Sequence, residues 1–197
     1  MTAGSGIIHQ EMPQASERML GCQIWVNLPA KNKMTDPTYG DITQDMIPVV
    51  SEENAEIRII AGSYQDKKGI FEGKYVKVTY IDVNLTPDST WIYNQTPNDE
   101  TLFIYLLDGT LAVDDDLSDF ENKSCAVLFS SSHQDALLND AVVVRSGNSG
   151  ARFVLLAAKP LHEPVAWGGP IVMNTKEELE LAFEELDKDV FIKHKMD

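Results

Sequence analysis

Apolar, β-branched and aromatic residues recur along the chain in short runs, which clusters of Gly, Pro, Asn and Asp separate. This spacing is typical of an antiparallel all-β sandwich or barrel, because each run is long enough for a strand but too short for a helix. The predicted strands are 22–28, 55–61, 75–85, 90–93, 102–107, 110–113, 125–129, 141–145 and 152–158. The pattern therefore predicts an all-β fold.

Two local signals refine this pattern. Within 75–85 the apolar positions change from one face of the strand to the other between Tyr80 and Ile81, which predicts a β-bulge at that point. Asp108-Gly109 separates two of the runs, and an Asp-Gly pair readily adopts the positive φ angles of a two-residue hairpin turn. We therefore expect a hairpin at Asp108-Gly109.

One amphipathic helix is predicted near the C-terminus. Thr175 and Glu178 have the spacing of a capping box. Apolar residues follow at positions i, i+3, i+4 and i+7, namely Leu179, Ala182, Phe183 and Leu186. This stripe is expected to pack on the sheet. The Pro- and Gly-rich segment 159–170 before the helix is interpreted as an irregular strap, with Trp167 as its anchor.

A linker is predicted over residues 29–48, which contain three prolines, one glycine and little periodicity. The predicted boundary near residue 47 gives an N-terminal piece, 1–47, and a C-terminal domain with the helix, 48–197. The N-terminal piece holds too few strands to bury a hydrophobic face by itself.

Composition limits the classes of partner. The chain has 197 residues, with 16 Lys and Arg against 31 Asp and Glu, so its formal net charge is −15. Such a surface repels nucleic acids and anionic membranes, and we expect no direct nucleic-acid or membrane partner. No apolar run approaches the ~18 residues of a membrane span and no signal peptide is evident, which favours a cytoplasmic location, or a nuclear one in a eukaryote. Cys22 and Cys125 lie in apolar runs and are expected to be buried, reduced thiols.

The candidate chemistry centres on His9 and Glu11. In an extended segment these two residues project from the same face, as ligands of one metal ion must. Imidazole and carboxylate suit Fe, Mn, Zn, Ni or Cu. The pair is a weak signal by itself, because surface pairs of this kind are common and the sequence holds no complementary His-x-His.

The other histidines and the acidic run offer weaker alternatives. His133, which has same-face spacing with Asp135, is interpreted as part of an exposed loop, His162-Glu163 as part of the hydrogen-bonded strap, and His194 as part of a solvated tail. The acidic run 114–116 lacks the Gly and distal Glu of an EF-hand and is interpreted as a solvated loop. Motifs for a nucleophilic Ser, a phosphate loop or a Cys-x-x-Cys site are missing from the sequence, so hydrolase and nucleotide-binding functions are disfavoured.

Longer motifs resemble one known family. The sequence reads MTAGSGIIHQEMP at 1–13, GCQIWVNLPAK at 21–31 and KPLHEPVAWGGPIVMNT at 159–175, with a further similar stretch, LLDGTL, at 106–111. These motifs, in this order, are similar to those of the pirins. The resemblance covers essentially the whole chain.

The resemblance implies a fold and an activity. Pirins are bicupins built from two cupin double-stranded β-helices (jelly-roll barrels), and the N-terminal barrel holds one metal, usually iron, by three histidines and a glutamate. Several pirins have quercetin 2,3-dioxygenase activity, and some are nuclear partners of transcription factors. By this resemblance His9 and Glu11 match the third and fourth metal ligands. The first two, an upstream His-x-His, are not in this sequence, so the chain is expected to begin inside the first barrel.

The resemblance also yields competing functional expectations. With Fe(II) as the family cofactor, Glu11 would act as ligand or as the base toward a flavonol-type small molecule, but two of four ligands predict weak or no dioxygenase activity. The second barrel is expected to be metal-free. The alternative is a non-catalytic interaction module that binds a protein partner. Finally, self-association through residues 1–47 is expected, because Ile24, Val26 and Leu28 would otherwise expose an apolar face.

Overall fold

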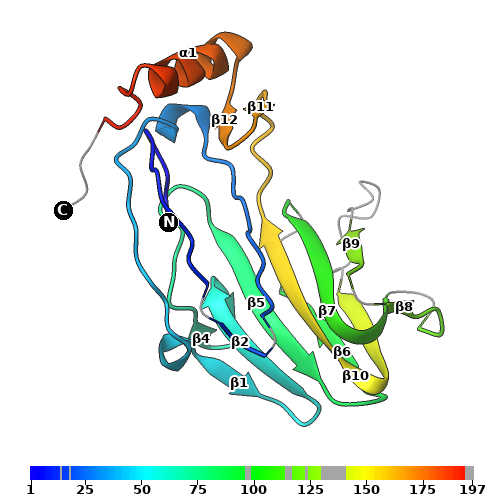
Figure 1. Ribbon diagram of the computed structural model, residues 1–197. Helices are drawn as coiled ribbons and strands as arrows, with labels where there is room; N and C mark the ends of the chain where they lie inside the picture. Colours follow the sequence, from blue (N-terminus) through cyan, green and yellow to red (C-terminus); the bar gives the residue numbers. More distant parts are fainter. Residues whose placement is uncertain are drawn as a thin grey trace. The chain divides into compact units, whose positions relative to one another are not determined.

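The computed structural model describes residues 1–13, 15–17, 19–95, 99–113, 117–122, 124–129 and 141–193 (Figure 1). Its contacts divide the chain into two compact units. One unit is Ile42–Pro160, and the other combines Met1–Asp41 with Leu161–Asp197. The predicted domain boundary near residue 47 stays a prediction. The C-terminal helix, which was assigned to the C-terminal domain, belongs by its contacts to the same unit as the N-terminal residues.

The unit Ile42–Pro160 is built from antiparallel strands, apart from the 3₁₀ turn η2 (Gln44–Met46). The strands are β1 (Val49–Ser51), β2 (Ala55–Ala61), β3 (Ser63–Tyr64), β4 (Lys67–Lys68), β5 (Val78–Leu85), β6 (Thr90–Tyr93), β7 (Thr101–Val113), β8 (Glu121–Asn122), β9 (Ala126–Phe129) and β10 (Val142–Ala158). The all-β prediction is confirmed. The bounds of β2 and β6 are those predicted, whereas β5 begins three residues later than expected and β9 one residue later.

The long strand β10 organises the sheet (Figure 1). Its C-terminal half pairs with β5 on one side and with the first half of β7 on the other. Its N-terminal half pairs with β6 and with the second half of β7. One half-sheet therefore runs β1-β2-β5-β10-β7-β9 and the other β6-β10-β7-β8, with β7 and β10 shared between them.

The predicted hairpin at Asp108-Gly109 is wrong, because both flanking runs belong to the single strand β7. Gly109 has the positive φ that was expected, 78°, but it marks an irregularity in the pairing with β10 instead of a chain reversal. Leu107 is the extra residue there, since Asp108 pairs with Arg152 and Leu106 with Phe153. The predicted strands 141–145 and 152–158 are likewise one strand, β10.

The β-bulge predicted within 75–85 is wrong in its strand, because the irregularity opposite Tyr80 and Ile81 lies on β2. Ile59 pairs with Ile81 and Ala61 pairs with Tyr80, so the extra residue in this ladder is Ile60 of β2. The ladder of β5 with β10 runs without interruption past the same point. The bulge therefore belongs to the β2–β5 pairing.

The hydrophobic core lies between the two half-sheets. In β2 buried residues alternate with partly exposed ones, as expected for a strand with one face on a core. Trp91 of one half-sheet lies 5.8 Å, between ring centroids, from Phe153 of the other. Trp91 Nε1 donates a hydrogen bond to the Tyr64 hydroxyl (3.1 Å), which itself donates to Glu52 Oε1 (2.7 Å). Burial is the main cause of the raised pKa of Tyr64, so its hydroxyl stays protonated at neutral pH.

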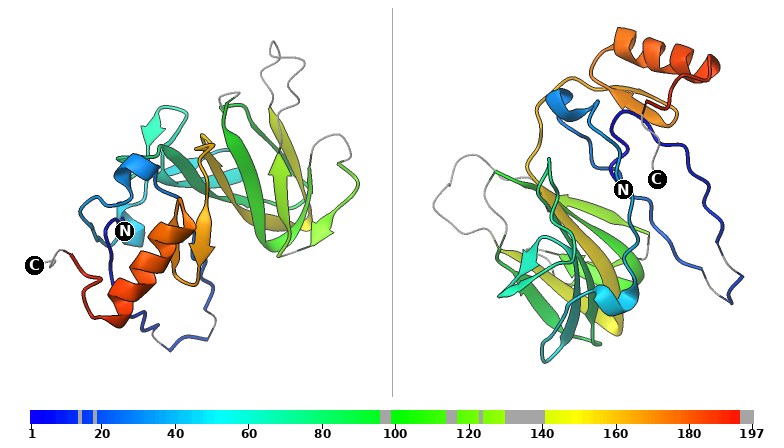
Figure 2. Two further views of the ribbon diagram at one scale, coloured as in Figure 1. Left: turned by 90° about the horizontal axis from the view of Figure 1, so that it is seen from above. Right: turned by 90° about the vertical axis from the view of Figure 1, so that its left-hand side faces the viewer.

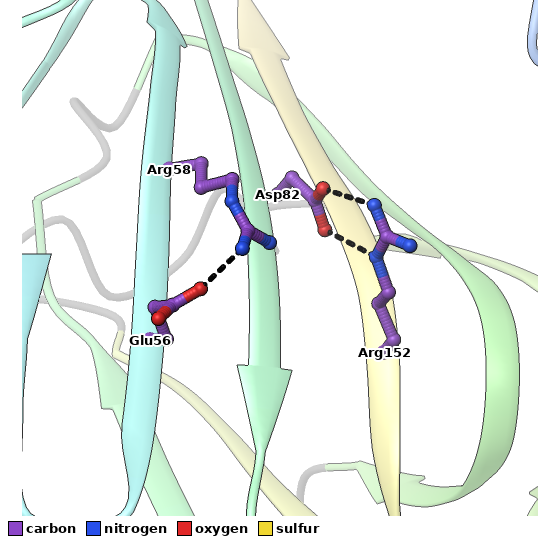
Figure 3. A network of polar contacts seen from close by, with 4 residues as sticks. All are labelled: Glu56, Arg58, Asp82 and Arg152. Atoms are coloured by element: carbon purple, nitrogen blue, oxygen red, sulfur yellow. Dashed lines mark hydrogen bonds and ion pairs between the residues drawn. The ribbon is translucent and has the colours of Figure 1, made fainter. Parts of the chain in front are cut away.

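Two ion pairs lie on the neighbouring strands β2, β5 and β10 (Figure 3). One pair is formed within β2, and the other joins β5 to β10. Arg152 Nε and Nη2 donate to the two carboxylate oxygens of Asp82, at 3.0 and 2.6 Å. Arg58 pairs with Glu56 at 2.5 Å. The Asp82 side chain is only 10% exposed, whereas that of Glu56 is 42% exposed. Desolvated Asp82 therefore depends on its bidentate partner more than Glu56 does on Arg58.

The second unit contains the predicted helix and a small sheet. The helix α1 (Lys176–Asp187) begins at the N-cap Thr175, and the capping box with Glu178 is confirmed. The helix lies beside the two-stranded sheet of β11 (Ala166–Gly168) and β12 (Ile171–Met173), as Figures 1 and 2 show. A Cβ added at Gly168 would lie 3.2 Å from both Leu179 and Phe183. Glycine at this position therefore allows the helix to pack closely on β11. The N-terminal part contributes a 3₁₀ turn, η1 (Ala30–Asn32).

Three predictions for this unit and for the cysteines are wrong. The segment 22–28 forms no strand, since no neighbouring chain among the described residues pairs with its backbone. Trp167 is 71% exposed and does not anchor the strap. Cys22 is exposed and Cys125 half-buried, although both are free thiols.

No helix in the described ranges is long and apolar enough to cross a membrane.

The two ion pairs give a stability prediction. Arg152→Ala should lower the free energy of unfolding by about 1–3 kcal/mol, because it leaves the desolvated Asp82 carboxylate without its donors. Arg58→Ala, on the more exposed pair, should lower it by about 0–1 kcal/mol. Urea unfolding followed by tryptophan fluorescence measures both. Equal losses in the two variants would contradict the assigned difference in burial.

Candidate metal centre

A tight turn precedes the predicted ligands. Gly4 and Gly6 have φ angles of 53° and 134°, in the region that favours glycine. The Ser5 amide donates to the Thr35 carbonyl (2.9 Å), and the Gly6 amide donates to the Ala3 carbonyl (3.0 Å). A Cβ at Gly4 would lie 2.1 Å from the Thr35 oxygen. The motif that carries the resemblance is therefore a backbone turn held against residue 35.

His9 and Glu11 follow this turn in a segment that belongs to no helix or strand. Both are exposed. Neither side chain makes a hydrogen bond or an ion pair with any residue that the structure describes. That both side chains project from one face stays a prediction, and the described residues bring no third metal donor to them.

The donor set does not fit a bound transition metal. No group of three or more His, Cys, Asp or Glu side chains able to hold an ion occurs within the described part of the chain. Protein sites for such ions use three or four ligands, so His9 and Glu11 are too few. His162 is exposed, and its neighbour Glu163 is used in hydrogen bonds. His133, Asp135, His194 and the acidic run 114–116 lie outside the described residues.

A polar cluster connects the N-terminal segment with the strap. The Ala30 amide donates to Glu163 Oε2 (2.7 Å), and Asn174 Nδ2 donates to the same oxygen (3.3 Å). Lys33 is buried and donates from Nζ to Asn27 Oδ1 (2.6 Å). Burial lowers the pKa of Lys33, while the charges of Glu163 and Glu178 act in the opposite direction. Glu163 is thus both an acceptor for the backbone and a counter-charge, which agrees with its predicted role as a hydrogen-bonded strap residue.

Exposed aromatic side chains lie beside this cluster in sequence. Trp25 and Trp167 pack edge to face, with ring centroids 6.5 Å apart, and are 53% and 71% exposed. The indole nitrogen of Trp167 donates to the Gly169 carbonyl (2.9 Å). Its polar edge is therefore satisfied, and its ring faces remain available to an apolar or cationic group.

The interior of the other unit has a different chemistry. Tyr64, Trp91 and Tyr93 stack on one another with centroid distances of 5.8–6.3 Å. All three are at most 4% exposed. Aromatic and aliphatic side chains therefore fill the space between the half-sheets. The expectation that this barrel is metal-free stays a prediction.

The sequence patterns missed one open cleft in this unit. Its volume is about 480 Å³, and its lining includes Ser63, Lys68, Thr79, Tyr93 and Glu100. These residues come from five places along the chain and share no motif. The clustering of lysines after residue 66 is the only sequence signal that points toward it.

Comparison with known proteins relates the chain to pirins. Residues 80–192 match the family model described as the Pirin C-terminal cupin domain. A Thermoplasma acidophilum protein named "Putative quercetin 2,3-dioxygenase" is 34% identical over an alignment that covers 99% of this chain and 78% of that protein. Pirin-1 of Arabidopsis thaliana and pirin of Homo sapiens are each 35% identical, over 94% and 92% of this chain. The chain spans 62% and 60% of the lengths of these two pirins.

A solved structure is similar as well. The crystal structure of quercetin 2,3-dioxygenase from Acinetobacter baumannii matches with a TM-score of 0.71 and 28% identity, covering 85% of this chain and 55% of that one. This likeness and the matched cupin model confirm the predicted fold class.

The polar cluster gives a prediction about local stability. Glu163→Ala should speed hydrogen exchange at the Ala30 amide and destabilise the cluster by about 1–3 kcal/mol, because the Ala30 amide loses its acceptor and the buried Lys33 loses one of two nearby carboxylate charges. Amide exchange measured by NMR tests this. Glu180→Ala, on the exposed side of α1, is the matched control and should leave exchange at Ala30 unchanged. Unaltered exchange in the Glu163 variant would contradict the assignment.

Proposed function

Because the chain belongs to the pirin family, we propose that it descends from the quercetin 2,3-dioxygenase lineage of cupins but has weak or no dioxygenase activity by itself. The observation that carries this proposal is the donor set. The family site needs three histidines and a glutamate, and this sequence supplies the two that correspond to His9 and Glu11. The exposure of both side chains supports the same view, because a dioxygenase site needs a water-poor pocket around its metal.

Physical reasons link the ligand count to activity. Each missing ligand removes one metal–donor bond and part of the preorganisation that holds the others, so Fe(II) affinity falls steeply. Glu11 has the chemistry of a proton acceptor for a flavonol hydroxyl, but a base assists only where the substrate is held beside it. We therefore keep Glu11 as the catalytic candidate of the family site and assign no turnover to the isolated pair.

The metal content of the purified chain tests this proposal. We expect well below one equivalent of iron after reconstitution with Fe(II), measured by inductively coupled plasma mass spectrometry, and no quercetin consumption above that of free Fe(II). His9→Ala should leave both values unchanged, because the pair by itself does not retain the ion. One equivalent of iron that His9→Ala abolishes, or robust quercetin turnover, would refute the proposal.

A second candidate function is that of a non-catalytic interaction module. Exposed apolar side chains in the N-terminal segment favour it, namely Ile8, Met12, Met19, Trp25 and Val26. A soluble protein rarely leaves such a set uncovered, so we propose that residues 1–47 bind another polypeptide, in the first instance a second copy of the chain. The Trp25–Trp167 pair supports this, since exposed tryptophans are frequent anchors of protein interfaces.

Self-association has its own test. Light scattering after size-exclusion chromatography should give a mass above that of the 21.9 kDa monomer, increasing with protein concentration. The double variant Trp25→Ser/Val26→Ser should shift the mass toward the monomer. Ile92→Ser, which removes a comparably exposed apolar side chain from β6, is the control and should not. A monomeric mass at every concentration would exclude a second copy as the partner.

A further inference from the structure

The open cleft of about 480 Å³ in the unit Ile42–Pro160 has the size of a small-molecule site. It lies where the ends of several strands meet, since Gly62 follows β2, Thr79 lies near the start of β5, Tyr93 ends β6 and Glu100 precedes β7. Gly62 has a φ of 79°, and a Cβ there would lie 2.9 Å from the Thr79 backbone. Because Gly62 has no Cβ, its backbone can lie directly against the backbone of Thr79 in the wall of the cleft.

The segment 67–77, part of which lines the cleft, is rich in lysine in an otherwise acidic protein; Lys68 and Lys77 line the cleft, and so does Glu72. Lys67, Lys68, Lys74 and Lys77 are four of the chain's 16 Lys and Arg residues, yet they fall within one short segment. Lysines concentrated in this way create a local positive potential despite the net charge of −15. An anionic group is therefore the ligand that this segment attracts.

Lys68 is the amine best placed to receive that group. Lys67 Nζ donates to the Val49 carbonyl (2.7 Å), and Lys77 pairs with Glu72. Lys74 lies over the Tyr75 ring, 5.1 Å from its centroid. Lys68 is exposed and lines the cleft, and its amine makes no hydrogen bond or ion pair among the described residues; its charge interacts with the Glu72 carboxylate, which is paired with Lys77.

Another part of the lining is acidic and half-buried. Glu100 lines the cleft and has no hydrogen-bond donor within the part of the chain that the structure describes. Burial raises its pKa, and the nearby charge of Asp99 acts in the same direction. A second negative charge on the ligand would be repelled there, whereas a hydroxyl group would supply the missing donor. A ligand with one negative charge and several neutral hydroxyl groups fits both the Lys68 side and the Glu100 side of the cleft.

The rest of the lining selects an aliphatic ligand over a flat aromatic one. Tyr93 is only 2% exposed, so its ring offers little surface for stacking. Ser63 and Thr79 add hydroxyl groups, which both donate and accept hydrogen bonds. We propose that this cleft binds a small aliphatic monocarboxylate with several hydroxyl groups, its carboxylate on Lys68 and its hydroxyl groups toward Glu100, Thr79 and Ser63.

Three probes separate the parts of this proposal. Gluconate carries both a carboxylate and hydroxyl groups, glucose carries only the hydroxyl groups, and acetate carries only the carboxylate. In a titration of the ¹⁵N-labelled full chain, gluconate should shift amide resonances of cleft residues such as Gly62 and Gly69. Its dissociation constant from the titration should be at least about tenfold lower than that of glucose or of acetate.

Matched lysine variants test the site itself. Lys68→Ala should weaken gluconate binding about tenfold, and Lys68→Arg should restore it. Lys74→Ala removes the same charge from the same segment but not from the cleft lining, and should leave the affinity unchanged. Glu100→Ala should reduce the preference for gluconate over acetate. Unchanged thermal unfolding would show that each variant is folded.

Four results would overturn the proposal. They are the absence of gluconate-dependent shifts at cleft residues, equal binding of glucose and gluconate, equal weakening by Lys68→Ala and Lys74→Ala, and an unaltered preference in Glu100→Ala. None of these depends on iron content or on self-association, so the cleft is tested separately from the proposed function.

Discussion

Close backbone contacts leave no room for a side chain at Gly109 of β7, which lies against β10, or at Gly150 of β10, which lies against the end of β5. A Cβ at Gly109 would lie 2.1 Å from the Gly150 oxygen, and one at Gly150 would lie 2.6 Å from the Leu85 oxygen. Both glycines have a φ of 78°. These close contacts allow both long strands to continue through an irregular register and to serve two half-sheets.

The rest of the unit Ile42–Pro160 follows from that continuity. Because β7 and β10 belong to both half-sheets, the inward faces of the two halves meet, and Trp91 comes to lie beside Phe153. Several strands begin or end at one rim, and the lining of the cleft there collects Ser63 of β3, Thr79 of β5 and Glu100, which precedes β7. The site is thus a product of the topology and not of a local motif.

The sequence predicted those elements whose signals are local. Alternation gave the bounds of β2 and β6, and the Thr175–Glu178 spacing gave the capped helix. It failed at Asp108-Gly109, because a positive φ at glycine is the same local requirement in a hairpin turn and in a strand irregularity. Only the pairing partner distinguishes them, and β10 lies far along the chain.

The candidate sites divide in the same way. His9 and Glu11 were found because their spacing is a motif, but the number of donors around them depends on tertiary contacts that no spacing reports. The cleft had no motif, and its clearest sequence signal, a cluster of lysines, is also what a solvated surface contains. The structure shows that Lys67 donates to the Val49 carbonyl and that Lys77 pairs with Glu72. Lys68 is therefore the lining lysine whose amine is open to a ligand.

The stability of the unit Ile42–Pro160 comes from apolar burial. The core between the half-sheets consists of buried aliphatic and aromatic residues. Removal of such surface from water is the main favourable contribution to folding. The hydrogen bonds from Trp91 to Tyr64 and from Tyr64 to Glu52 satisfy the polar groups that enter this core. A cupin domain held in this way can take up a different ligand chemistry at its rim, because the rim residues contribute little to the packing that maintains the fold.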